Sequence, residues 1–215
     1  MTEAASPPSW LEGAWRREGL ALGGGPLVER SDVLWLQVGR FFADLRVPHT
    51  EEDPEASRWD VAQAFSGTID YQAPRLTWRH DLDTAPRPAG HADTAVVEFH
   101  DGVLLERGDD YLEQWRREEG PRRAAVIQRD VRGTGTVDAR IVQVGDRALA
   151  VWADPAPVGA VLERRPGRWS VTATVGIELP ADPGPEALLQ LAEDPSEPLP
   201  DGWRTMTGDP RRVTG

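Results

Sequence analysis

The chain contains no cysteine, no lysine and no asparagine. Without cysteine it cannot form a disulfide, use a thiolate as a nucleophile or ligate zinc through sulfur. Without lysine, arginine carries the positive charge, and its planar guanidinium group pairs with carboxylates and stacks on indole rings. These absences exclude thiol chemistry and favour networks of arginine, carboxylate and tryptophan.

Several common catalytic and binding motifs are also missing. No serine lies in a Gly-x-Ser-x-Gly turn, so the sequence does not indicate a serine hydrolase. The triple glycine at residues 23–25 is not followed by the Lys-Ser/Thr pair of a phosphate-binding loop. No two of the four histidines have the His-x-His or His-x3-His spacing of metal ligands. We therefore expect neither a metal nor a cofactor.

The charge balance is strongly acidic, with a formal net charge of -12 at pH 7. This disfavours nucleic acid, because phosphate binding requires a basic surface. It also disfavours an anionic membrane surface and favours neutral or cationic ligands, although a local arginine cluster can reverse that preference inside a pocket. No long apolar run follows Met1-Thr2-Glu3, so we expect no signal peptide, no membrane span and a cytoplasmic location.

Tryptophan is abundant, at nine residues, while phenylalanine and tyrosine are few. Four stretches with β-strand character combine a tryptophan with arginine and a carboxylate, at residues 11–18, 35–46, 76–81 and 111–118. Successive side chains of a strand point to opposite faces, so apolar and polar groups two residues apart share one face. Such a face suits a barrel interior that holds a polar-headed organic molecule. The alternative is tryptophan packed inside with ion pairs outside.

Short runs with strand character follow one another at hairpin spacing from residue 11 onwards. The clearest hairpin joins residues 94–100 and 103–107 through Asp101-Gly102, a favoured two-residue turn. Similar turns at Gly145-Asp146 and Pro166-Gly167 continue the pattern. We therefore predict an all-β fold, an antiparallel barrel of about ten strands.

The two ends of the chain differ in composition from the middle. We divide it into a flexible leader over residues 1–10, a barrel domain over 11–179 and a loose extension over 180–215 that is rich in proline and acidic side chains. Within the extension, residues 185–193 predict a short helix, because proline stands near its start and Leu188, Leu189 and Leu191 give it an apolar side.

The first strand, Leu11-x-Gly-x-Trp-Arg-x-Glu-Gly19, resembles the Gly-x-Trp opening of the calycin superfamily, which includes lipocalins, fatty-acid-binding proteins and nitrobindins. It is most similar to the nitrobindin version, with Arg17 in place of the middle glycine. The resemblance implies an antiparallel barrel with one internal pocket, in which Trp15 closes one end and stacks on an arginine. Nitrobindins ligate haem through a histidine late in the barrel, and this chain has no histidine after His100.

Later motifs resemble uncharacterised bacterial calycin-like proteins. They are Trp35-Leu-Gln, Phe42-x-Asp-x-Arg46 and Tyr111-x-Glu-x-Trp115-x-Arg117. The resemblance extends the expected barrel through these residues and attaches no reaction to them.

Tyr111, Glu113, Trp115 and Arg117 share one face of their strand, because they stand two residues apart. A face with large aromatic side chains is expected to point inward, which brings Glu113 to the lumen. A buried carboxylate requires a cationic partner or a proton. Glu113 is therefore either half of an ion pair that braces the barrel wall or a group that orients a ligand or transfers a proton.

Asp44 and Arg46 share a face with Phe42. The opposite face is uniformly apolar: Phe41, Ala43, Leu45 and Val47. If that apolar face covers the core, Asp44 and Arg46 point to solvent. If the lumen is polar, as in a barrel that holds one small ligand, they point into it. Both placements stay open.

His80 shares a face with Leu76, Trp78 and Leu82 and is the histidine best placed for the interior. Its imidazole titrates near neutral pH, which makes it a candidate general acid or base. The alternative is a histidine with only a structural role in the core or at the rim. His91 belongs to a Pro/Gly loop.

The favoured function is the binding of a small apolar or aromatic molecule inside the barrel. Trp35, Trp78 and Trp115 supply stacking area. Tyr111 donates a hydrogen bond, and Arg46 or Arg117 meets a polar or anionic group of the ligand.

Two other functions fit the same sequence. The first is a cofactor-free enzyme, an isomerase, cyclase or hydratase, that uses Glu113, His80 and Asp44 as acid/base groups. The second is a protein-interaction barrel that uses its acidic exterior and its proline-rich tail. Pairing of exposed strand edges would also allow a homodimer.

Overall fold

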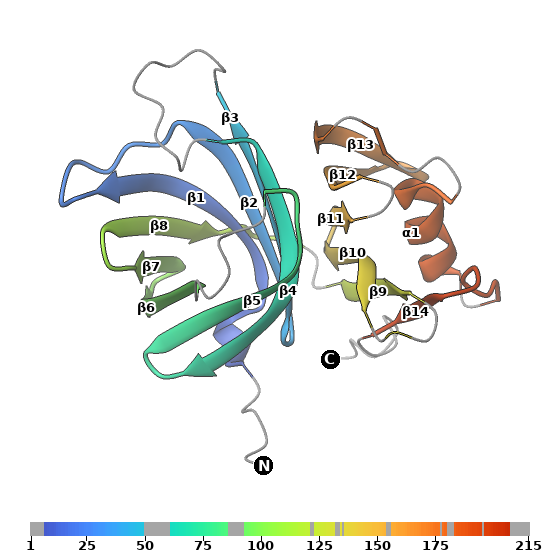
Figure 1. The fold of residues 1–215 in the computed structure, drawn as a ribbon, viewed down its shortest axis with the longest axis horizontal. Helices are drawn as coiled ribbons and strands as arrows, with labels where there is room; N and C mark the ends of the chain where they lie inside the picture. The colour runs from blue at the N-terminus through green and yellow to red at the C-terminus, as the bar shows by residue number, and fades with distance from the viewer. Residues whose placement is uncertain are drawn as a thin grey trace.

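The structure of the 215-residue chain is a computed structural model. It describes residues 7–49, 61–85, 93–120, 123–131, 134, 136–153, 156–176, 178–179, 183–194 and 196–206. This part of the chain folds into two β-sheets with one α-helix (Figure 1). No helix in these ranges is long and apolar enough to cross a lipid bilayer.

Eight consecutive antiparallel strands close into a barrel, in which the first strand pairs with the eighth. They are β1 (Gly13–Leu22), β2 (Ser31–Val38), β3 (Phe41–Pro48), β4 (Gln63–Gln72), β5 (Arg75–Asp83), β6 (Asp93–His100), β7 (Val103–Arg107) and β8 (Tyr111–Arg117). The hairpin predicted at Asp101-Gly102 is confirmed. It joins β6 to β7, and both turn residues have the positive φ, 50° and 79°, that this turn requires.

A second sheet of six strands follows the barrel, in the order β13-β12-β11-β10-β9-β14. Its strands are β9 (Ala124–Asp130), β10 (Val137–Val144), β11 (Arg147–Trp152), β12 (Val158–Arg165), β13 (Arg168–Val175) and β14 (Trp203–Thr205). The predicted short helix is confirmed as α1 (Pro185–Glu193). It covers the face of the second sheet that points away from the barrel (Figure 1).

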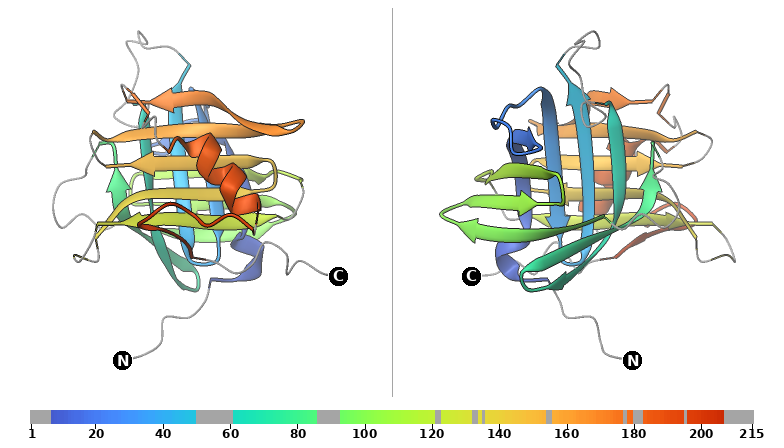
Figure 2. Two further views of the ribbon diagram at one scale, coloured as in Figure 1. Left: turned by 90° about the vertical axis from the view of Figure 1, so that its right-hand side faces the viewer. Right: turned by 60° about the vertical axis from the view of Figure 1, so that its left-hand side comes forward.

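An apolar layer joins the barrel to the second sheet. Ala43 and Leu45 on the outside of β3 belong to the same buried cluster as Val142 and Leu149 of the second sheet. The strands of the second sheet cross β2, β3 and β4 instead of running along them (Figure 2). The barrel wall at β3 is therefore buried on both faces, by the lumen inside and by the second sheet outside.

One end of the barrel, which we call the closed end, is filled by aromatic side chains. The single-turn helix η1 (Ser9–Leu11) lies there, and the Nε1–H of Trp15 donates to the carbonyl of Leu11 at 2.8 Å. Trp15 is fully buried, and the guanidinium carbon of Arg117 lies 5.9 Å from the centre of its ring. Trp15 thus closes one end and stacks on an arginine, as the Gly-x-Trp resemblance implies.

The division of the chain differs from the predicted one. The strands expected over residues 11–179 form an eight-stranded barrel and most of a separate sheet, in place of one barrel of about ten strands. Alternating side chains predict a series of hairpins, but they do not show which strand closes the ring. The expected boundary at residue 180 falls within the second layer, because β14 pairs with β9 and the Leu188 and Leu189 side chains of α1 are fully buried.

Candidate functional site

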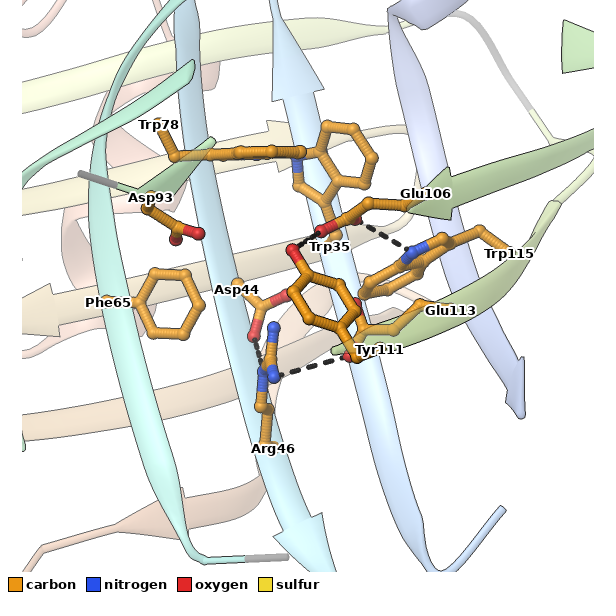
Figure 3. A pocket seen from close by; sticks show the side chains of 10 residues that line it. All are labelled: Trp35, Asp44, Arg46, Phe65, Trp78, Asp93, Glu106, Tyr111, Glu113 and Trp115. Carbon is orange, nitrogen blue, oxygen red and sulfur yellow. Dashed lines mark hydrogen bonds and ion pairs between the residues drawn. The ribbon is translucent and has the colours of Figure 1, made fainter. Parts of the chain in front are cut away.

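A pocket lies inside the barrel, toward the end where β3 and β5 finish and β6 and β8 begin (Figure 3). Its free volume is about 20 Å³, which is room for about one water-sized group. Aromatic rings, one arginine and several carboxyl groups line it: Trp35, Phe65, Trp78, Tyr111, Trp115, Arg46, Asp44, Asp93, Glu106 and Glu113. The lining combines apolar walls with more acidic than basic groups.

Glu113 is the centre of an ion-pair network. Its Oε1 accepts a hydrogen bond from Nη1 of Arg17 at 2.7 Å and lies 3.5 Å from Nη1 of Arg46. Arg17 also pairs with Glu29, with 2.8 Å between Nε and Oε2, and Nε of Arg46 donates to Asp44 at 2.9 Å. Glu113 therefore links two pairs, and only 1% of it is exposed.

Burial and charge act against each other in this network. Burial lowers the pKa of Arg17 and of Arg46, but the carboxylates beside them outweigh burial, and the pKa of each arginine is raised. At Asp44 burial is the larger effect, and the pKa of this carboxyl is raised although Arg46 opposes the shift. The two guanidinium groups remain charged inside the barrel.

Glu106 lies directly opposite Glu113 on the neighbouring strands β7 and β8. Its carboxyl oxygens accept hydrogen bonds from two neutral donors, the hydroxyl of Tyr111 at 2.8 Å and the indole N–H of Trp115 at 3.1 Å. Burial, followed by the charges of Glu113 and Asp93, raises the pKa of Glu106 well above its ordinary value. Because like charges opposite each other repel, this environment favours a proton on Glu106.

The aromatic walls of the pocket hold one another in place. The ring of Trp35 meets those of Trp115 and Trp78 edge to face, with centroids 5.6 Å and 5.9 Å apart. Burial, and next the charge of Glu106, raise the pKa of Tyr111, so its hydroxyl keeps its proton and donates to Glu106. The pocket is thus bounded by packed rings and by hydrogen bonds with a fixed direction.

His80 lies beside the pocket and does not line it. Its Nδ1 is 3.0 Å from Oδ2 of Asp83, its Nε2 is 2.9 Å from Oδ2 of Asp93, and its ring stacks on Phe65 with centroids 4.4 Å apart. Through Asp93, His80 orients one carboxylate of the lining. Among the described residues, no group of three or more histidine and acidic side chains could hold a metal ion.

The structure brings together most of the candidate residues named from the sequence. His80 and Arg117 do not line the pocket. The other seven candidates do: Trp35, Asp44, Arg46, Trp78, Tyr111, Glu113 and Trp115. Arg117 is on the predicted strand face but lies beyond the pocket, at the closed end over Trp15. Arg117 therefore does not line the barrel pocket. His91 lies outside the described residues.

The open question about Asp44 and Arg46 has a structural answer. Both side chains point into the lumen, where they are 4% and 8% exposed. The apolar face of the same strand packs on the second sheet through Ala43 and Leu45. The alternation in the sequence correctly separated the polar face of this strand from its apolar face. It could not show which face points into the lumen, because both are buried.

Sequence reasoning missed three residues of the lining, Phe65, Asp93 and Glu106. For Glu106 a signal was present, because it stands two residues after Leu104, whose side chain is fully buried. Phe65 and Asp93 lie near the starts of β4 and β6, and the sequence before each of these strands has no clear alternation. Arg17, which pairs with Glu113, was recognised only as a departure from the Gly-x-Trp motif.

A second and larger cleft, with a free volume of about 830 Å³, lies where the closed end of the barrel meets the second sheet. Two of its charged lining residues, Glu118 and Arg147, form an ion pair at the surface. Nε of Arg147 lies 3.1 Å from Oε2 of Glu118, and Nε of Arg16 lies 3.0 Å from Oε1 of the same residue. The barrel pocket, where charge is buried, is therefore the stronger candidate site.

No protein-family model matches the chain, and no curated protein matches its sequence. A solved structure, that of the uncharacterized protein YLR301w from Saccharomyces cerevisiae, is similar to it with a TM-score of 0.54. The match covers 76% of this chain and 85% of the yeast chain, at 14% sequence identity. At this identity the similarity shows the fold alone.

Proposed function

We propose that this protein binds a small organic molecule, apolar or aromatic in its larger part, with one polar group in the pocket of the barrel, which has room for a water-sized group, and its larger part extending from the pocket. The observation that carries this proposal is the uneven distribution of charge in the lumen. Near the closed end the interior is apolar, with side chains such as Leu11, Trp15 and Leu76. Around the pocket it holds buried ionisable groups such as Arg46 and Glu113.

Buried ionisable groups of this kind are unfavourable for stability alone. Removal of an ion from water costs several kcal/mol, and apolar side chains of similar volume often give an equally or more stable core. Ligand sites, in contrast, combine apolar walls with a few placed polar groups. The lining of rings and carboxyl groups in Figure 3 supports such a site.

Native mass spectrometry of the purified protein, followed by denaturing extraction, tests this proposal. We expect a small molecule that leaves on denaturation, or quenching of tryptophan fluorescence when aromatic compounds are added to the empty protein. Quenching is expected to decrease in Trp115→Phe, which changes the pocket, and to persist in Trp203→Phe, which changes the second sheet. Absence of both a bound molecule and pocket-dependent quenching would contradict the proposal.

A second candidate function is acid/base catalysis in the same pocket, favoured by the Glu106–Glu113 pair. The surroundings of Glu106 raise its pKa and favour a proton, while Glu113 is paired with guanidinium groups, and two carboxyl groups in such different environments can act as acid and base. Glu106, rather than Glu113, is then the proton donor. Any extracted molecule is incubated with the protein and its mass followed with time. Glu106→Gln is expected to stop turnover, because an amide group does not transfer a proton.

A further inference from the structure

The pocket has an excess of acidic over basic groups. Four carboxyl groups line it, whereas Arg46 is the single guanidinium group among the lining residues that the structure describes. From outside the lining, Arg17 pairs with Glu113, and Nε2 of His80 lies 2.9 Å from Oδ2 of Asp93. Arg46 is shared between Asp44 and Glu113, at 2.9 Å and 3.5 Å. Its charge is therefore balanced by the protein, and the expected contact between Arg46 and an anionic ligand group has little support.

Glu106 differs from the other buried acids in its partners. Among the described residues, no guanidinium group lies within ion-pair distance of its carboxyl group, which receives only the neutral donors of Tyr111 and Trp115. In the view of Figure 3, the carboxyl groups of Glu106 and Asp93 flank the space beneath the indole of Trp78. A cation in this space would meet two carboxyl groups and aromatic rings, which also attract cations.

The dimensions of the pocket suit the same kind of group. Its 20 Å³ accommodates a water-sized group, and an ammonium group has about that size. Tyr111 and Asp93 are partly exposed to solvent, Asp93 with 15% of its side chain, so the organic part of a ligand can extend from the pocket past them. The net charge of -12 attracts cations to the protein over longer distances.

We propose that the ligand is a small primary amine in its protonated form, whose ammonium group is held between Glu106 and Asp93 and whose organic part lies against Trp78 and Tyr111. This inference rests on the proposed function, since it names the chemical class that the barrel pocket takes. Binding of the ammonium ion stabilises the Glu106 carboxylate, so the carboxyl group releases its proton to solvent as the amine binds.

Isothermal titration calorimetry with three probes of one shape tests the inference: 2-phenylethylamine, 2-phenylethanol and phenylacetate. We expect the amine to bind at least about tenfold more tightly than the alcohol, because it makes charge-assisted hydrogen bonds, and the carboxylate not to bind. Titrations in two buffers with different ionisation enthalpies are expected to show release of a proton with the amine alone.

Variants connect the result to the pocket. Glu106→Gln keeps the size of the side chain and is expected to reduce amine affinity by about tenfold or more and to abolish proton release. Asp93→Asn is a second variant with the same expected loss of affinity. The matched control is Glu98→Gln, an identical change at an exposed position of β6, which is expected to alter neither quantity.

The outcomes separate this inference from the function on which it rests. If the alcohol or the carboxylate binds as tightly as the amine, or if Glu106→Gln and Asp93→Asn bind the amine normally, the amine inference is wrong while ligand binding stands. If none of the three probes binds, the amine inference is wrong. The proposed function then fails as well only if native mass spectrometry and fluorescence also find no ligand.

Discussion

Replacement of Glu113 by glutamine tests the ion-pair network that surrounds the pocket. The change removes the negative charge that pairs with Arg17 at 2.7 Å and with Arg46 at 3.5 Å, and leaves a neutral amide oxygen as the acceptor. A hydrogen bond to a charged group contributes about 1.5–3 kcal/mol, and loss of one partner of a buried pair costs about 3–5 kcal/mol. Each arginine keeps one carboxylate, Glu29 or Asp44, so we expect a loss near the lower values, about 2–3 kcal/mol.

Glu106→Gln is the matched control for this prediction, because the same substitution is made directly opposite on the neighbouring strand. A glutamine at this position can accept from Trp115 and donate to Tyr111, so we expect no decrease in the free energy of unfolding at pH 7. Urea unfolding followed by near-ultraviolet circular dichroism measures both variants against the parent protein. Equal losses in the two variants, or a larger loss in Glu106→Gln, would refute the distinction between an ion-paired and a protonated glutamate.

Three further predictions address pH, sheet packing and the C-terminal part. The folded state binds the Glu106 proton more tightly than the unfolded state, because the pKa of Glu106 is raised on folding. As the pH rises above about 4.3, the parent protein should therefore lose stability relative to Glu106→Gln. Urea unfolding at a series of pH values measures this, and the same pH dependence of stability in both proteins would contradict it. Gly159→Ala places a Cβ 2.1 Å from the Cβ of Ala64 and should cost about 1–3 kcal/mol in urea unfolding, whereas Gly120→Ala, with open space around it, should cost little. Trp203→Ala should lower stability by about 3 kcal/mol because the indole is buried in the second sheet, and a loss below about 1 kcal/mol would indicate a loosely attached strand.

Local patterns in the sequence predicted the parts of the site that depend on one strand. Period-two alternation correctly placed Tyr111, Glu113 and Trp115 on one inward face, since alternation is a property of any single extended strand. The helix at residues 185–193 followed from local signals of the same kind. The place of Trp15 beside Arg117 was, in contrast, expected only from the resemblance of the first strand to known barrels.

The remaining features depend on which strands become neighbours, and alternation does not contain that information. Glu106 faces Glu113 only because β7 and β8 pair in one register. Asp44 and Arg46 could not be assigned to a face, because the second sheet that covers the opposite face was interpreted as part of the barrel. Arg117 lies on the predicted face of β8 but beyond the pocket, because the pocket contacts only part of that strand.

The most direct test of the central claim, that the barrel pocket binds a small molecule, is nuclear magnetic resonance of the indole N–H groups during titration with 2-phenylethylamine. The indole N–H of Trp115 donates to Glu106, so its signal should shift most, with smaller shifts at Trp35. The signals of Trp152 and Trp169 in the second sheet should stay unchanged. Shifts confined to the tryptophans of the second sheet would place binding outside the barrel and contradict the account, whereas no shift at all would contradict the amine inference.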